Sequence, residues 1–226
     1  GNQWTLAGGW FTATRDHRPE WRTPHAELGA PRPNAQAQPQ LFRPRQTSTT
    51  PFASEGRQVG TAQATFITPS DLVLTWNLEG VAGGERMISA YGTTRPANER
   101  TGAWFGPSEG GWGALIDDHF LGANAPEQVI FNYIFDSAGQ PVWTLGGGSE
   151  LGGTMQHRVF FVHCPVCPAL IDAPAVPAGS STTVYSGLTS GTYSTNITLP
   201  SPLSGSWIRN NLPIIMLTTP QPSPSP

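Results

Sequence analysis

Residues 129–145 read VIFNYIFDSAGQPVWTL, and this stretch decides the fold class. Its two ends, Val129–Phe135 and Pro141–Leu145, are rich in the β-branched and aromatic residues that favour strands. Asp136–Gln140 between them includes Gly139, which adopts the positive φ of a tight connection without steric cost. The stretch therefore predicts an antiparallel β-hairpin.

Strand-like runs also lie on both sides of this hairpin. Ala62–Phe66 and Leu72–Trp76 flank a Pro-Ser-Asp turn, and Phe160–Val162 forms a short apolar run. Gly (26 residues) and Pro (23 residues) exceed a fifth of the 226-residue chain, and both disfavour helices. Short strands joined by turns predict an all-β chain of antiparallel β-sandwich or barrel-like modules, with almost no helix.

The second strand of the hairpin opens a segment that recurs in the chain. Trp4–Gly9 reads WTLAGG, and Trp143–Gly148 reads WTLGGG. A second block matches without a gap, and its equivalent pairs are Gly60 and Gly191, Phe66 and Ile197, Pro69 and Pro200, Leu72 and Leu203, and Trp76 and Trp207. Two blocks in the same order predict two tandem β-modules.

A third block, Thr101–Gly113, occurs once, at the start of the second copy. Its counterpart in the first copy would precede Gly1, so we expect the first module to be incomplete at its N-terminus. The predicted organisation is a partial first β-repeat at 1–100 with a Pro-rich loop at 22–58, a complete second repeat at 101–219, and a Pro/Ser linker or tail at 220–226.

Two motifs of the second copy resemble a known family. Residues 104–113 read WFGPSEGGWG, and residues 131–143 read FNYIFDSAGQPVW. Together they resemble a β-rich tandem repeat of secreted gammaproteobacterial proteins, with the pattern Trp-Trp/Phe-x-Pro-x-Glu-Ser-Gly-Trp-Gly followed by Tyr-x-Tyr/Phe-Asp-x-x-Gly-x-Pro-x-Trp. Gly110 stands where that family has Ser. The family has no assigned activity, so the resemblance implies secretion and a β-fold rather than a function.

The charge balance sets aside nucleic acid as a partner. The net charge is −3, only 12% of residues are charged, and the chain contains no Lys. The Arg residues of the first 58 positions are spread along a Pro-rich stretch, and we interpret them as solvated. The chain contains no run of about 18 apolar residues, so its sequence does not predict a membrane-spanning helix. We expect an extracellular, cell-surface or periplasmic protein, whose start at Gly1 indicates processing or a fragment.

Cys164 and Cys167 lie close together in the sequence HCPVCP. In a secreted chain this spacing favours a local disulfide. A metal site and a redox motif are the alternatives, although the first lacks a second ligand pair and the second lacks a βαβ setting. Asn196-Ile197-Thr198 is a glycosylation sequon in hosts that have the transferase.

Exposed Trp residues would suit carbohydrate binding, because a flat ring covers the apolar face of a sugar. Four of the eight Trp residues occupy matched repeat positions, and we expect them in the core: Trp4, Trp76, Trp143 and Trp207. The other four are candidate binding residues: Trp112, Trp104, Trp10 and Trp21.

Enzymatic signatures are weak, so we assign no catalytic residue, metal or cofactor. Asp117-Asp118-His119 is interpreted as a solvated turn, and Gly146–Gly148 as another turn. His157 and His163 would share a face of one strand, which leaves open a metal pair. A Gly-x-Ser-x-Gly elbow is absent. The glutamates that might form a glycosidase pair lie in apparent loops or turns: Glu79, Glu85, Glu99, Glu109, Glu127 and Glu150.

The leading functional hypothesis is a non-enzymatic structural or interaction module whose partners are other protein subunits or further copies of itself. An incomplete first module would leave a sheet edge that accepts a strand from a neighbouring chain. The alternatives are a carbohydrate-binding module, which requires at least two exposed coplanar aromatic rings, and an extracellular hydrolase or its accessory domain. The hydrolase requires converging carboxylates or a Ser/His pair in one cleft.

Overall fold

The computed structural model describes residues 4–7, 9–13, 18–28, 34–50, 52–68, 71–88, 100–119, 127–162 and 175–217. Every regular element in these ranges is a β-strand, which confirms the all-β prediction. The strands of the first half are β1 (Trp4–Ala7), β2 (Trp10–Ala13), β3 (Pro19–Leu28), β4 (Gln36–Ala37), β5 (Gln40–Thr49), β6 (Phe52–Thr68), β7 (Asp71–Leu78) and β8 (Val81–Ile88).

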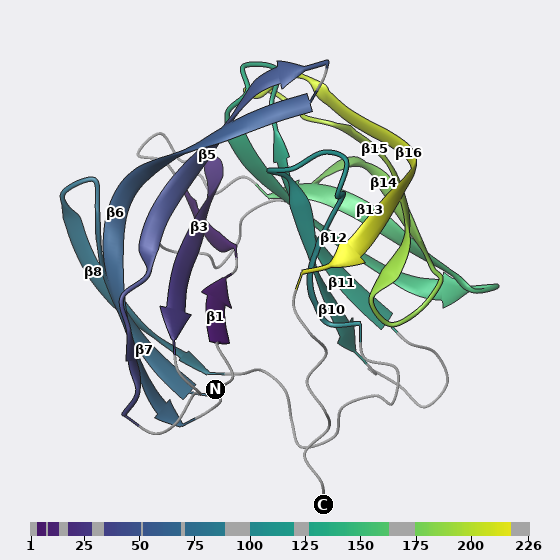
Figure 1. The fold of residues 1–226 in the computed structure, drawn as a ribbon. Coiled ribbons are helices and arrows are strands. Elements are labelled where there is room, and N and C mark those ends of the chain that lie inside the picture. Colours follow the sequence, from purple (N-terminus) through teal and green to yellow (C-terminus); the bar gives the residue numbers. More distant parts are fainter. Residues whose placement is uncertain are drawn as a thin grey trace, which may run out of the picture. The chain divides into compact units, whose positions relative to one another are not determined.

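The second half contributes another eight strands (Figure 1). They are β9 (Gly102–Phe105), β10 (Gly113–His119), β11 (Glu127–Phe135), β12 (Pro141–Leu151), β13 (Thr154–Val162), β14 (Ala175–Tyr185), β15 (Ser190–Thr198) and β16 (Ser206–Met216).

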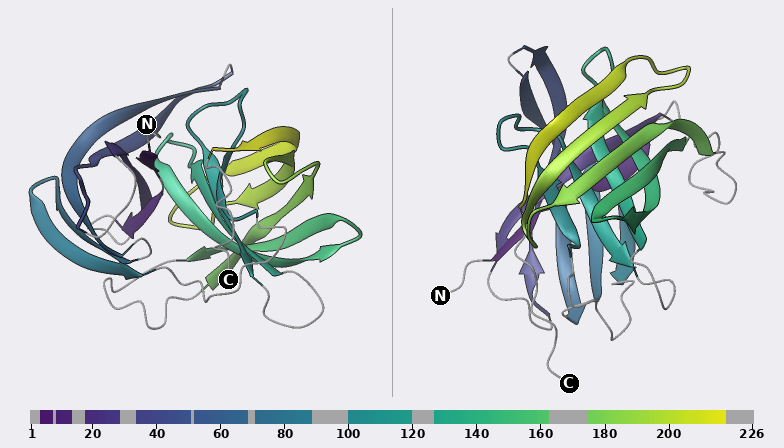
Figure 2. Two further views of the ribbon diagram at one scale, coloured as in Figure 1. Left: turned by 60° about the horizontal axis from the view of Figure 1, so that its bottom comes forward. Right: turned by 90° about the vertical axis from the view of Figure 1, so that its right-hand side faces the viewer.

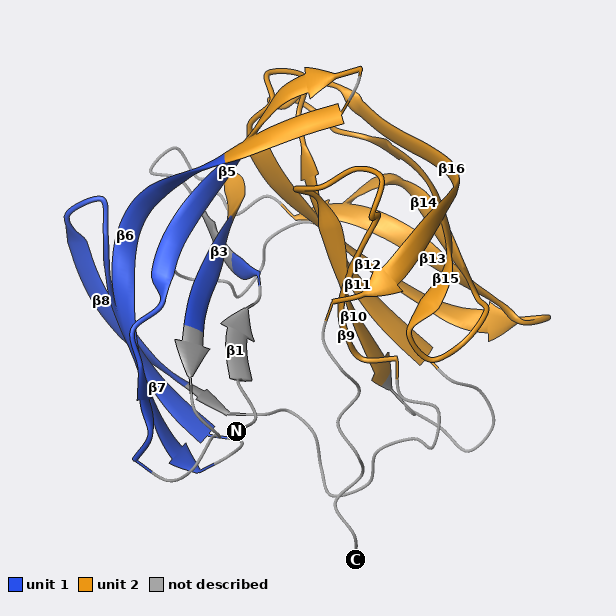
Figure 3. Cartoon of the chain, in the orientation of Figure 1, with its two compact units in different colours: residues 1–10, 22–44, 56–94 blue, residues 11–21, 45–55, 95–226 orange. Residues whose placement is uncertain are grey.

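The chain divides into two compact units that interleave in sequence (Figure 3). Unit 1 comprises residues 1–10, 22–44 and 56–94, and unit 2 comprises residues 11–21, 45–55 and 95–226. The units therefore differ from two consecutive repeats, because two segments from the first half of the chain belong to unit 2.

Unit 2 contains a closed eight-stranded barrel. Its strands follow one another as an antiparallel meander from β9 to β16, and β16 pairs with β9 to close the barrel (Figure 2). Along β11 the inward positions are Gln128, Ile130, Asn132 and Ile134, each of which is buried. Closure satisfies both edges of the sheet, so no strand of this barrel offers a free edge for pairing.

The β11–β12 connection confirms the predicted hairpin. Phe135 pairs with Pro141, and Gly139 has φ of 71°. One carboxylate oxygen of Asp136 accepts hydrogen bonds from the amides of Ala138 (2.9 Å) and Gln140 (2.8 Å). Asp136 and Gly139 together stabilise the turn. Asp136 accepts hydrogen bonds from the backbone amides of the turn, and Gly139 adopts the left-handed backbone conformation that the turn requires.

Three sequence interpretations are wrong. Gly146–Gly148 is not a turn but lies within β12, and Asp117-Asp118-His119 is the end of β10. The expected Pro-rich loop at 22–58 is mostly strand, since β3, β5 and the start of β6 cross it. Side chains alternate along β5, and this alternation buries Leu41.

The core of unit 2 is aromatic at one end of the barrel. Trp207 packs edge-on against Trp112, with ring centroids 5.6 Å apart, and against Phe52 at 5.8 Å. The indole nitrogen of Trp21 donates to the carbonyl oxygen of Ile134 at 3.1 Å, and its ring lies 5.3 Å from Tyr133. Segments 11–21 and 45–55 thus complete the packing of unit 2 through Trp21 and Phe52.

Unit 1 is built on an open sheet, with strand order β1-β3-β5-β6-β7-β8. Among the side chains that the structure describes, its core is formed by Ala26, Ala37, Leu41, Val59, Ala62, Ala64 and Leu74. Trp76 lies across Gly83 of the neighbouring strand, where an added Cβ would stand 2.6 Å from the indole ring. Gly83 therefore makes room for a large ring at the edge of the sheet.

Candidate functional site

The densest polar cluster among the described residues lies inside the barrel of unit 2. Asp118, Gln128, His157 and Ser181 come from four different strands, and each is at most 5% exposed. The strand register places them at one level of the barrel, because Asp118 pairs with Gln128, and Gly148 pairs with both Gln128 and His157. His157 in turn pairs with Ser181, which continues the level onto β14.

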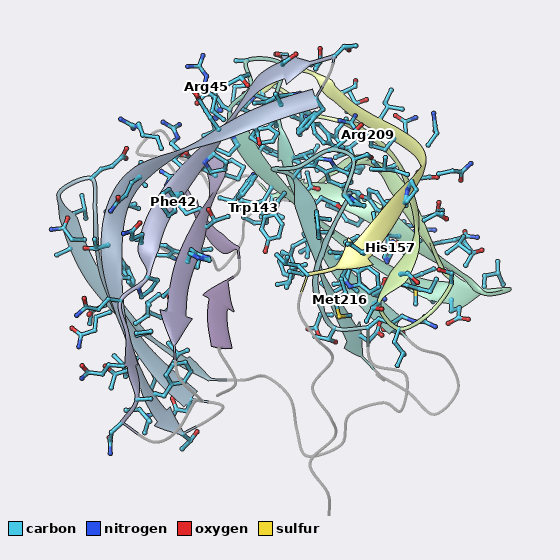
Figure 4. All side chains as sticks on the ribbon, in the orientation of Figure 1. Phe42, Arg45, Trp143, His157, Arg209 and Met216 are labelled. Carbon is cyan, nitrogen blue, oxygen red and sulfur yellow. The ribbon has the colours of Figure 1, made fainter. Side chains whose placement is uncertain are left out.

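Gly148 makes the central contact of this cluster possible. It stands between Gln128 and His157 in the sheet and carries no side chain, so their side chains meet across β12. His157 Nε2 lies 2.9 Å from Gln128 Oε1. An added Cβ at Gly148 would stand 1.6 Å from the carbonyl oxygen of Gln156, which shows how closely the two strands approach. Figure 4 shows His157 among the barrel strands.

The hydrogen bonds fix the protonation of His157. Gln128 Oε1 is an acceptor only, so His157 Nε2 carries the proton and donates to it. The Ser181 hydroxyl lies 3.3 Å from Nδ1 and donates to that nitrogen. Burial lowers the pKa of His157 to about 4, and a hydrogen bond to the backbone of Ser181 opposes this only in part. The ring is therefore neutral at pH 7.

The remaining partners link the cluster to the end of the barrel. Tyr185 donates its hydroxyl to Gln128 Oε1 at 2.9 Å, while the amide of Gln128 donates to the Asp118 carboxylate. The backbone amide of Arg100 donates to the other oxygen of Asp118 at 2.8 Å. The Arg100 guanidinium lies 4.1 Å from the centroid of Tyr185, and burial raises the pKa of that phenol. The cluster is thus a connected network.

A second, smaller polar contact lies deeper along the same barrel. Tyr193 donates its hydroxyl to Asn132 Oδ1 at 2.6 Å, and Asn132 Nδ2 donates to Thr144 Oγ1 at 3.1 Å. Burial raises the pKa of Tyr193 to about 12, so the phenol stays protonated and keeps its role as donor. Both polar contacts therefore hold inward-facing side chains in fixed positions inside the core.

The geometry of the first cluster argues against hydrolysis. Ser181 and His157 form the Ser/His pair that a hydrolase requires, but each side chain is 2% exposed, which leaves no approach for a substrate. A His with a pKa of about 4 is also a weak general base at neutral pH. The third member is the amide of Gln128 rather than a carboxylate that would stabilise an imidazolium. The network fits a structural role.

The candidate binding tryptophans lie in the cores of the two units. Trp112, Trp104 and Trp21 are 4%, 2% and 4% exposed. Trp10 is half-buried and meets Trp76 edge-on, with an interplanar angle of 66°. No two of these four rings form the exposed coplanar platform that stacking on a sugar requires. Of the expected core residues, Trp207 is buried and Trp143 and Trp76 pack against the cores.

The first unit offers a different kind of site at the edges of its sheet. In the described part of the chain, β1 and β8 each have one hydrogen-bonded neighbour in the sheet, β3 and β7 respectively. On β8, Val81 pairs with Leu78, a half-buried residue that packs against the core, and Val81 is nevertheless 53% exposed. An apolar side chain on the core side of an edge strand, with backbone groups free to pair, is a surface for strand addition.

Several predicted residues lie elsewhere or outside the described ranges. Cys164, Cys167 and His163 lie outside the residues that the structure describes, as does Glu99. Glu85, Glu127 and Glu150 are in strands rather than in loops. No group of three metal-ligating side chains occurs among the described residues. No helix within the described ranges has the length and apolar character of a membrane span.

Three members of the network, Gln128, Ser181 and Tyr185, were not predicted from the sequence. A signal for them exists, because each is a polar residue at an inward position of an alternating strand. His157 shows the same pattern between Met155 and Val159, both of which are 1% exposed. Their clustering depends on strand register, which periodicity within one strand does not reveal.

In comparisons with known proteins, no family model matches the chain, and neither the curated proteins nor the solved structures include a significant match.

Proposed function

We propose that this chain is a non-enzymatic structural module of a secreted or surface-attached assembly, and that unit 1 joins it to other chains by β-strand addition. The observation that carries the proposal is the open sheet of unit 1, in which β1 and β8 are the outer strands. Strand addition uses the backbone hydrogen bonds of an edge for affinity and the facing side chains for specificity.

A comparison of the strand order in the two units supports the tandem repeat. Trp4 of β1 corresponds to Trp143 of β12, Gly60 of β6 to Gly191 of β15, and Trp76 of β7 to Trp207 of β16. With these anchors, the order β1-β3-β5-β6-β7-β8 matches β12-β13-β14-β15-β16-β9 of the barrel. Two strands of the barrel, β10 and β11, have no equivalent among the described residues of unit 1.

The match is one of strand order and not of register. Trp76 pairs with Ala62, whereas Trp207 pairs with Ile197, which corresponds in sequence to Phe66. The cause lies in the length of the preceding connection. Only two residues separate β6, which ends at Thr68, from β7, whereas residues 199–205 precede β16 as a loop that buries Leu199 and Leu203. The comparison therefore supports the number of missing strands without fixing their register.

The secreted location rests on composition and on the family resemblance. A chain without Lys, with 12% charged residues and with polarity supplied by Ser, Thr, Asn and Gln, is typical of extracellular β-proteins. A disulfide between Cys164 and Cys167 would fit the same compartment. Such a disulfide should disappear from a peptide mass map after reduction, and two free thiols in the native protein would argue against it.

Sedimentation velocity over a range of concentrations tests the proposed function. A purified chain with an open edge should associate into species larger than the 24.1 kDa monomer. Val81→Asp places a charge on the core side of β8 and should shift the protein toward monomer, while Ala82→Asp, on the opposite face of the same strand, should leave association unchanged. A wild-type chain that is monomeric at every concentration would contradict the proposal.

A further inference from the structure

We infer that the segment that completes unit 1 is a two-stranded β-hairpin of the β10–β11 kind, presented by another polypeptide. The inference rests on the proposed function and names its partner more closely: the expected ligand is neither a single extended strand nor a helix. Three properties of the described residues lead to this partner, namely strand direction, strand number and the composition of the core.

Strand direction favours an even number of added strands. Neighbours in the sheet of unit 1 run antiparallel, and the path from β1 to β8 contains six strands, so β8 runs opposite to β1. One strand added antiparallel to β8 would therefore run parallel to β1. Two added strands, joined as a hairpin, pair antiparallel with both edges.

A comparison with the number of strands in the barrel of unit 2 also indicates that two strands are added. There β9 pairs with β10, β10 with β11, and β11 with β12. Since β8 and β1 hold the positions of β9 and β12, the hairpin β10–β11 is the part of the barrel without an equivalent among the described residues of unit 1. Closure by two strands would extend the path of six strands in unit 1 to eight, the number of strands in the barrel of unit 2.

The cores of the two units show what the hairpin has to supply. In unit 2, β10 contributes Ala114 and Ile116 to the core, and β11 contributes Ile130 and Ile134. Among the described side chains of unit 1, the buried cluster has seven residues, of which three are larger than Ala: Leu41, Val59 and Leu74. The partner hairpin must therefore alternate apolar side chains toward this core.

The edge strand β8 also restricts which hairpins are accepted. Glu85 pairs with Leu74 and so lies on the core side of the strand, where it is exposed. A charge at this position opposes pairing with a wholly apolar strand and limits unspecific edge-to-edge contact. The β10–β11 kind of hairpin meets this requirement, because Gln128 and Asn132 place amide donors among its inward residues.

A synthetic peptide with the sequence of residues 113–135 tests the inference on the full chain. We expect it to bind with a stoichiometry of one peptide per chain and to dissolve the self-associated species seen by sedimentation. A peptide of residues 127–135 alone should bind at least tenfold more weakly. Val81→Asp should reduce the affinity for the hairpin peptide at least tenfold, and Ala82→Asp should leave it unchanged.

Amide hydrogen exchange locates the peptide. Protection should appear at β8 and β1, and protection at β9 and β12 instead would show exchange into the barrel and overturn the inference. Self-association that depends on Val81 but is not affected by the hairpin peptide would also overturn it, while leaving the proposed function in place. If the chain does not associate at any concentration in sedimentation velocity without peptide, that result contradicts the proposed function itself.

Discussion

His157 of β13 and Gln128 of β11 are hydrogen bonded at 2.9 Å across an intervening strand, and Gly148 is the residue that lies between them. Any side chain at position 148 would press on the backbone of Gln156. This relationship explains why a glycine stands at position 148 of a barrel strand. It also makes the interior network sensitive to a single methyl group.

Gly148→Ala should destabilise unit 2 strongly. Its Cβ would stand 1.6 Å from the Gln156 carbonyl oxygen, so β12 and β13 must separate, at a cost of about 3 kcal/mol or more. Gly147→Ala is the matched control, since no atom lies within 4 Å of its added Cβ, and it should change stability by less than about 0.5 kcal/mol. Urea unfolding compares the two, and equal effects would contradict the proposed packing.

The buried His157 should make folding sensitive to mild acid. Its folded pKa is about 4 and its ordinary value is 6.5, so the unfolded chain binds the extra proton first as pH falls. Stability should therefore decrease from about pH 6.5 to about pH 4, by roughly 3 kcal/mol in total, and level off below. Urea unfolding of wild type and His157→Gln at several pH values measures this, since the variant lacks the titrating ring. Parallel pH profiles of the two would be evidence against a buried neutral imidazole.

Trp112→Ala should act on stability rather than on ligand binding. The ring is 4% exposed and packs against Trp207 and Tyr193, so its removal should cost about 3–5 kcal/mol. Leu151→Ala is a suitable comparison, because that side chain is 70% exposed and should matter little. Chemical unfolding measures both. A fully stable Trp112→Ala protein that lost binding on a glycan array would instead favour a carbohydrate site.

Gly139→Ala should weaken the β11–β12 turn. The residue has φ of 71°, where an L side chain costs about 1–2 kcal/mol, and its added Cβ would stand 2.4 Å from the Gln46 carbonyl oxygen. Gly110→Ala lies in open space and serves as the control. The expected signs are a lower melting temperature for Gly139→Ala and an unchanged one for Gly110→Ala. The same melting temperature for both variants would show that the turn tolerates a side chain.

The sequence predicts the fold class and the central hairpin because their signals are local. Alternating apolar residues, the Asp136 side chain and Gly139 act within a few residues of one another, and each has its expected structural role. The same local reasoning fails for Gly146–Gly148, because the close neighbours of Gly146 and Gly148 lie on the adjacent strands β11 and β13. It also fails for residues 22–58, where pairing overrides the turn preference of Pro.

The buried network depends on contacts that periodicity does not contain. Gln128, His157 and Ser181 are separated by 29 and 24 positions, and they meet only after three strand pairs have found their register. The tryptophans show another limit of sequence analysis. The composition gives their number but does not show which of them are buried. Trp112 and Trp104, which lack a repeat partner, are as buried as the matched Trp207.

Hydrogen exchange at β8 tests the central claim most directly, when associated wild-type protein is compared with Val81→Asp at the same concentration. If strands of another chain pair with this edge, amides of Val81–Ile88 should exchange at least tenfold more slowly in the associated wild type, while those of β12 remain unchanged. Equal exchange rates at β8 in the two samples would contradict strand addition at unit 1.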